Sequence, residues 1–156
     1  YNKHLSDAIS QCFDMSSGKI KLLFSDKRYD DFGHSLRAMG LDMINGEWLL
    51  MTNEDNYYVP TFLEIVDKNI SRNPKTNFVY CNMLHSYKQF GPYKAFTPKI
   101  EFGWIDIGSF MVPSTLAKQV GFKSRRSYAD WEFIQDIRHQ NKLCPLFIEQ
   151  YLFVHN

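Results

Sequence analysis

The polar run Asn53–Glu54–Asp55 directly follows an apolar stretch, residues 47–52, whose composition predicts a strand covered on both faces. In extended backbone, positions i and i+2 point to the same side, so Asn53 and Asp55 can converge on one ligand, with Glu54 between them as a second acidic group. An amide oxygen and a carboxylate are hard donors that suit Mg²⁺ or Mn²⁺, and such an ion can bridge to a diphosphate. The alternative is a polar loop that caps the helix predicted to begin near Pro60.

Asp130 and the pair Trp104 and Asp106 are candidates for activating or binding a second substrate. An Asp carboxyl with an ordinary pKa of about 4 is raised by partial burial, here beside Trp131, which brings it closer to the range of a general base. The alternative is an N-cap for the helix that follows. Trp104 offers an indole platform for the apolar face of a sugar, and Asp106 can accept hydrogen bonds from its hydroxyls; an indole that covers the sheet is the alternative.

Two further side chains complete the candidate site. An imidazole can join carboxylates around a transition metal such as Mn²⁺, so His155, near the end of the chain, is a third candidate ligand beside Asp55 and Asn53. A structural or solvent-exposed histidine is the alternative. Arg37 falls beside the apolar stripe of a predicted helix, so its head can point toward a site at the edge of the sheet.

The elements that must position these residues alternate between helices and strands. In open α/β sheets, ligands bind outside the carboxyl ends of the strands, so we expect residues 53–55 to follow a central strand and Asp130 to face them across a cleft. The pattern predicts one α/β domain with a mixed, mostly parallel sheet flanked by helices. Helices are predicted over residues 5–15, 30–45, 60–73, 113–120 and 128–140, strands over 19–24, 47–52, 77–81, 107–112, 144–148 and 151–154, and an antiparallel excursion over 84–103.

Composition excludes several classes of function. The formal net charge of +1 comes from scattered Lys and Arg residues, so the chain lacks the basic face that nucleic-acid binding needs. The three cysteines are far apart with no C-x-x-C pair, which argues against a zinc site or a disulfide framework and indicates a reducing compartment. No apolar run approaches the length of a membrane span. We therefore expect a cytoplasmic location, with peripheral attachment to a membrane left open.

Four segments resemble the family 2 inverting glycosyltransferases of GT-A fold, in the family's order. Residues 46–64, GEWLLMTNEDNYYVPTFLE, are similar to the family's central segment, where an apolar strand leads into an Asp-x-Asp motif. Residues 33–41 resemble its Arg-Asn helix, and 108–122 its Gly-Ser strand and the short helix after it. Residues 128–133 occupy the place of its Glu-Asp-aromatic motif. The closing strand ends with His155, where many members carry a histidine.

The resemblance implies a role for each candidate residue. The aspartate that matches the family's general base is Asp130, which would take a proton from the acceptor hydroxyl. Asp55 matches the position that touches the metal, whereas Asn53 replaces the first aspartate of the motif and lowers the charge available to a cation. The implied sets are Arg37, Asn53, Glu54 and Asp55 for the donor, Trp104, Asp106 and Trp131 for the acceptor, and Asp55, Asn53 and His155 for Mn²⁺ or Mg²⁺.

The implied function is metal-assisted transfer of a sugar, with inversion, from a nucleotide-diphosphate sugar to a hydroxyl of a carbohydrate or lipid-linked acceptor. We expect the family's opening strand–helix–strand to lie before Tyr1, so residues 1–156 are interpreted as a single partial domain. A sheet edge left uncovered in this way predicts a homodimer. One alternative is a catalytically impaired sugar- or nucleotide-binding remnant. Another is a nucleotidyltransferase, although no Gly-rich phosphate loop precedes a basic helix.

Overall fold

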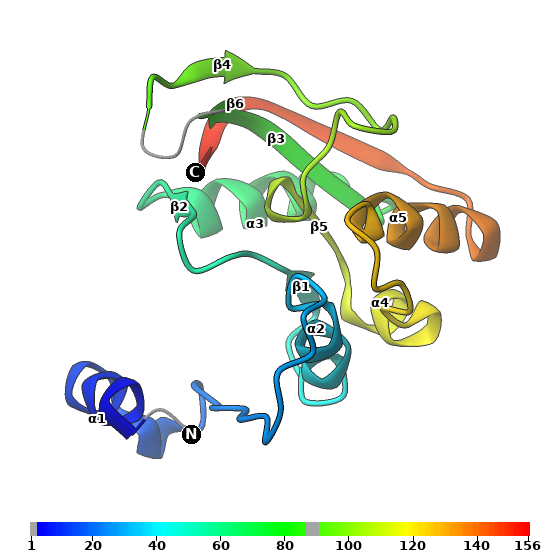
Figure 1. The fold of residues 1–156 in the computed structure, drawn as a ribbon. Coiled ribbons are helices and arrows are strands. Elements are labelled where there is room, and N and C mark those ends of the chain that lie inside the picture. Colours follow the sequence, from blue (N-terminus) through cyan, green and yellow to red (C-terminus); the bar gives the residue numbers. More distant parts are fainter. Residues whose placement is uncertain (1–2, 87–90) are drawn as a thin grey trace.

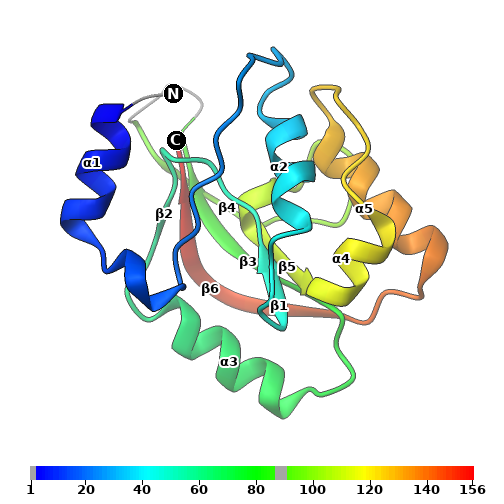
Figure 2. The same ribbon diagram turned by 90° about the horizontal axis from the view of Figure 1, so that it is seen from below.

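The computed structural model describes residues 3–86 and 91–156, which form a mixed sheet with helices on both faces (Figures 1 and 2). The strand order is β1-β5-β3-β6-β2, and β4 pairs with the second half of β3. In chain order the elements are α1 (Lys3–Cys12), the 3-10 turn η1 (Met15–Ser17), α2 (His34–Leu41), β1 (Trp48–Leu50), β2 (Tyr57–Tyr58), α3 (Phe62–Arg72), β3 (Phe78–His85), β4 (Lys94–Phe96), the 3-10 turn η2 (Ile107–Ser109), β5 (Phe110–Pro113), α4 (Ser114–Val120), α5 (Ala129–Gln140) and β6 (Pro145–His155).

Two hydrophobic layers hold the sheet between its helices. Helix α3 covers one face, whereas α4 and α5 cover the other (Figure 2). Successive residues of a strand point to opposite faces, so Phe78 of β3 packs toward α5 with Ile134, while Val79 packs toward α3 with Val66. Each such side chain contributes about 1.5–3 kcal/mol when fully removed from water. The alternation makes β3 the centre of both layers.

The sheet is mainly antiparallel, so the prediction of a mostly parallel sheet was wrong. Only β3 and β6 run parallel among the strand pairs of the described residues, and all other pairs are antiparallel. A parallel pair needs a long crossover, which α4 and α5 supply between β3 and β6; the shorter links reverse the chain instead. Strand β1 lies at one edge of this sheet, so the expected central position of the strand before residues 53–55 was also wrong.

The N-terminal segment departs most from expectation. Residues 19–24 form no strand, and a cleft of about 380 Å³ separates residues 19, 21 and 23 from β1. An alternating apolar sequence becomes a strand only where a partner offers backbone hydrogen bonds, and no strand of the described residues pairs with it. Helix α2 is shorter than predicted and begins after Gly33, whose φ is 79°, rather than after Asp30 or Asp31. The Asp31 carboxylate instead accepts a hydrogen bond from the Ser35 amide at 2.9 Å.

The C-terminal half follows the prediction more closely. Helices α3, α4 and α5 confirm the periodic segments, and β4 confirms the antiparallel excursion, of which residues 87–90 lie outside the described part of the chain. Residues 107–112 begin as the turn η2 because the Asp106 side chain accepts from the Gly108 amide at 2.7 Å. The two predicted closing strands are one strand, β6, which stays paired with β3 through a register shift near Asn82. None of the helices described is long and apolar enough to cross a membrane.

Gly108 is a position where η2 meets the sheet without space for a side chain. A Cβ atom there would lie 2.6 Å from Cζ of Phe153, and the Tyr58 hydroxyl donates to the Gly108 carbonyl at 2.8 Å. We expect Gly108→Ala to lower the free energy of unfolding by about 1–3 kcal/mol, because the ring of Phe153 must shift in a packed core. Urea unfolding measures this.

The matched control is Gly40→Ala in α2, where nothing lies within 4 Å of the added Cβ. This substitution should be neutral or stabilise by up to about 1 kcal/mol, because Ala is the better helix former. Equal stability of Gly108→Ala and the parent would mean that η2 is not tightly packed against β6.

Candidate functional site

A cleft of about 410 Å³ opens where the end of β1, the start of α2, η2 and the start of α5 meet. Six residues predicted for the site line it, although they come from four separate segments of the chain. The sequence did not single out four other lining residues. The lining residues are Arg37, Asn53, Glu54, Asp55, Asp106 and Asp130 from the predicted set, together with Phe32, His34, Ile107 and Ser127.

Asp130 lies in the first turn of α5 and faces the same cleft as Asp55. Its Oδ2 accepts a hydrogen bond from the Ile107 amide at 3.2 Å, which ties α5 to η2. Burial raises the pKa of the Asp130 carboxyl to about 6, and the negative charge of Asp106 adds to the increase. The alternative role as a helix cap does not apply, since the N-cap residue is Tyr128 and it makes no side-chain cap.

Asp106 connects η2 to the end of β6. Its Oδ1 accepts from the Gly108 amide, and its Oδ2 lies 3.2 Å from Nε2 of His155. The bond to Asp106 raises the pKa of His155, against the opposing effect of burial. The His155 ring also stacks on His85, with centroids 4.6 Å apart and planes 5° apart. Both oxygens of Asp106 are therefore engaged within the protein, so its predicted contact with acceptor hydroxyls competes with a structural role.

Arg37 reaches into the cleft from α2 and is held by three acceptors. Its Nη1 donates to the Phe32 carbonyl at 2.8 Å and to Nδ1 of His34 at 2.9 Å, and its Nη2 donates to Oδ1 of Asn53. Because the guanidinium can only donate, Nδ1 of His34 must be an acceptor and the ring neutral. Burial, and then the charge of Arg37, lower the pKa of His34. His34 thus belongs to the site, and its place one helical turn before Arg37 is the signal that sequence reasoning missed.

The predicted metal ligands differ in which of their donor atoms lack a hydrogen-bond partner. Oδ1 of Asp55 is buried without a hydrogen-bond partner, which suits a ligand. Nδ1 of His155 is likewise buried without a partner, although Nε2 of the same ring is bonded to Asp106. In contrast, Oδ1 of Asn53 accepts from Arg37. Within the described residues, no group of three or more His, Cys, Asp or Glu side chains is placed to hold a metal ion. Metal binding by Asp55, Asn53 and His155 stays a prediction.

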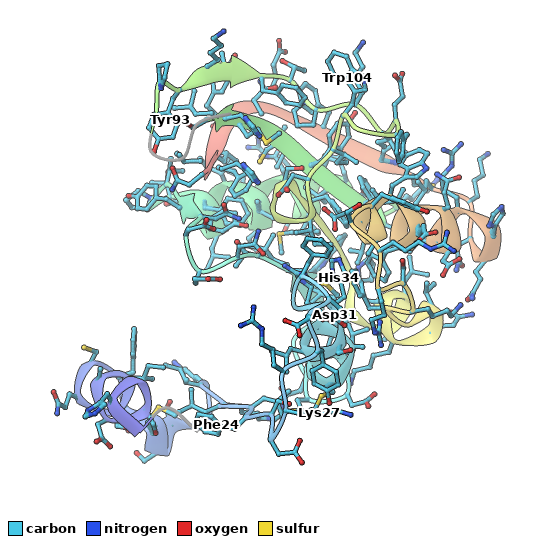
Figure 3. The ribbon with its side chains drawn as sticks, viewed as in Figure 1. Phe24, Lys27, Asp31, His34, Tyr93 and Trp104 are labelled. Carbon is cyan, nitrogen blue, oxygen red and sulfur yellow. The ribbon has the colours of Figure 1, made fainter. Side chains whose placement is uncertain are left out.

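The two tryptophans predicted for the acceptor do not line the cleft. Trp104 stacks on Phe96 with ring centroids 5.6 Å apart, and it lies well away from His34 in Figure 3. Trp131 is half-buried and packs against the hydrophobic layer under α5, where the edge of Phe102 contacts it. Their roles toward an acceptor stay predictions, because a large acceptor can extend beyond the cleft.

The fold is similar to that of solved structures of TarS. No family model and no curated protein matches the sequence. The crystal structure of Staphylococcus aureus TarS 1-349 matches with a TM-score of 0.70 and 14% identity, over 97% of this chain and 48% of that one. The complex of TarS 1-349 with UDP-GlcNAc matches with a TM-score of 0.70 and 13% identity, over 99% and 47%. The complex with UDP gives 0.65 and 14%, over 97% and 48%. The chain thus has a glycosyltransferase-like α/β fold and spans about half the length of these neighbours.

The raised pKa of Asp130 predicts a pH dependence of stability. Between about pH 4 and pH 6 the unfolded chain releases a proton that folded Asp130 retains, so stability falls as the pH rises through this window. The loss is at most about 3 kcal/mol, since a shift of one pKa unit equals about 1.4 kcal/mol. Asp130→Asn removes this titration and keeps an acceptor for the Ile107 amide.

We expect the free energy of unfolding of Asp130→Asn, relative to the parent, to rise by up to about 3 kcal/mol between pH 4 and pH 7. Urea unfolding at several pH values measures the difference. Asp67→Asn, on the exposed side of α3, is the control. A constant difference between Asp130→Asn and the parent would show that the carboxyl is ordinarily solvated.

Proposed function

We propose that this chain is part of an enzyme that transfers a sugar, with inversion, from a nucleotide-diphosphate sugar to an acceptor hydroxyl. The observation that carries the proposal is the half-buried Asp130 carboxyl, with a pKa of about 6, in one cleft with Arg37 and Asp55. The similarity to TarS structures, two of them with UDP-GlcNAc or UDP, supports a nucleotide-sugar donor. The acceptor, a carbohydrate or a lipid-linked sugar, is proposed from the resemblance alone.

Asp130 is proposed as the general base. With a pKa of about 6 it is roughly nine-tenths ionised at pH 7, and it is still basic enough to accept a proton. It would take the proton of the acceptor hydroxyl while that oxygen forms a bond to the anomeric carbon. The bond from the anomeric carbon to the diphosphate oxygen breaks in the same step, and the leaving group keeps the electron pair. One displacement of this kind inverts the anomeric centre.

The diphosphate needs positive charge as it leaves, and Arg37 is placed to supply some of it. Assistance by Mn²⁺ or Mg²⁺ stays a prediction: Oδ1 of Asp55 and Nδ1 of His155 are buried without partners, whereas Oδ1 of Asn53 accepts from Arg37. When bound, a divalent ion would stabilise charge on the diphosphate.

A second candidate function is that of a sugar- or nucleotide-binding remnant without turnover. The engagement of Oδ1 of Asn53 by Arg37 favours it, because Asn53 was expected to face a ligand. Turnover of a nucleotide sugar, including slow hydrolysis without an acceptor, separates the two functions.

Asp130→Asn is the direct test of the base. The substitution keeps the size of the side chain and removes its basicity, so the rate of sugar transfer should fall about 10²–10⁴-fold while UDP affinity stays the same. Transfer is measured as UDP released from UDP-GlcNAc with an acceptor present, and UDP affinity by calorimetry.

The control for this experiment is Glu132→Gln, which lies on the same helix and contacts Arg126 outside the cleft. It should transfer sugar like the parent. A parent-like rate for Asp130→Asn would remove the base assignment, and an inactive parent that binds UDP would favour the remnant.

We also propose that the chain self-associates through the edge of β1. Two observations support this: β1 lies at the edge of the sheet, and Leu23 and Phe24 are exposed in the segment that faces β1 across a cleft of about 380 Å³. Sedimentation equilibrium should show the average mass rising above 18.4 kDa with concentration. A mass that stays at 18.4 kDa over the whole range would contradict self-association.

A further inference from the structure

The Arg37 guanidinium is held in the cleft by neutral groups alone. Its three hydrogen-bond acceptors are the Phe32 carbonyl, the neutral ring of His34 and the amide of Asn53. No salt bridge within the described residues includes Arg37. A partly buried cation normally has an anionic partner, because loss of water is otherwise uncompensated. The charge of Arg37 is therefore fixed in place without being neutralised.

The guanidinium also keeps hydrogen-bonding capacity. It has five N–H groups, of which three are used. Its Nε is buried without a partner, which leaves one N–H of Nη2 as the group that a ligand in the cleft can reach. A guanidinium with a delocalised positive charge and a free N–H attracts phosphate oxygens, so an oxyanion is the ligand that fits this head group.

Other charges in the cleft make Arg37 decisive for such a ligand. Glu54, Asp55, Asp106 and Asp130 line the same cleft and repel an anion. Asp106 is compensated by His155, and the charge of Arg37 favours ionised Asp130, but neither carboxylate forms an ion pair with Arg37. Among the described residues that line the cleft, Arg37 is the one with a permanent positive charge.

The identity of residue 53 decides whether that charge stays available. An aspartate there would accept the same hydrogen bond as Asn53 and form an ion pair with the guanidinium. We propose that Asn53 holds Arg37 without neutralising it, so that Arg37 binds the diphosphate of the nucleotide sugar directly. The inference rests on the proposed function and names the pair of residues that recognises the phosphates.

Asn53→Asp tests the inference, with UDP and uridine as probes. The titrations are run by calorimetry in EDTA, so that divalent ions contribute nothing. The variant should bind UDP about tenfold more weakly than the parent, because Arg37 is neutralised and a further carboxylate faces the phosphates. Uridine has no phosphate, so its affinity should not change. Arg37→Gln should lose UDP affinity in the same selective way, and it replaces Asn53→Asp if that variant does not fold.

The matched control is Asn56→Asp, which adds the same charge to the same loop but bonds to Thr52 and Asn156 rather than to Arg37. It should bind UDP within about twofold of the parent. Three results would each overturn the inference and leave the proposed function standing. The first is an equal loss of UDP affinity in the two Asp variants, and the second is an equal loss of affinity for UDP and uridine in Asn53→Asp. The third is a parent protein that binds UDP only when Mn²⁺ is present. A parent that turns over no UDP-GlcNAc and binds neither probe under any condition would overturn the proposed function itself.

Discussion

The Asp106 carboxylate links η2 to the distant end of β6, and the geometry of the cleft depends on this link. One oxygen fixes η2 through the Gly108 amide, and the other holds His155 at the end of β6. With η2 fixed, the Ile107 amide is in place to bind Asp130, and the charge of Asp106 contributes to the raised pKa of that carboxyl. One side chain thus sets both the position and the basicity of the proposed general base.

This dependence explains why the sequence predicted which residues line the cleft but not which neighbouring groups they bond to. The order of motifs placed Asp55 and Asp130 at element ends, and the fold brings them to one cleft. The partners of each group could not be read from spacing, because they are set by how η2, β6 and α2 meet. Asp106, expected to bind an acceptor, also holds His155, and Asn53, expected to bind a metal, also accepts from Arg37; their roles toward ligands stay predictions.

The helices of the fold were also easier to predict from the sequence than the strands. Helices α3, α4 and α5 were predictable because their apolar periodicity and end signals are local in the sequence. Strands were less predictable because each one needs a partner: residues 19–24 have a strand-like sequence but pair with no described strand, whereas β6 is continuous because it pairs with β3 on both sides of the irregularity at residues 149–150. The parallel or antiparallel sense of the sheet depends on the lengths of the connections, which composition does not fix.

Asn53, in place of the aspartate of the resembling family, alters the balance of charge in a site that is proposed to bind a diphosphate. With an aspartate, the pair with Arg37 would cancel, and the remaining carboxylates would leave positive charge to be supplied almost entirely by a bound cation. With asparagine, one permanent positive charge remains on the protein, and Oδ1 of Asp55 and Nδ1 of His155 are both without a hydrogen-bond partner and can attract a cation. Under the proposed function, Arg37 and a bound cation would therefore share the charge of the diphosphate, with Asn53 holding Arg37 in place.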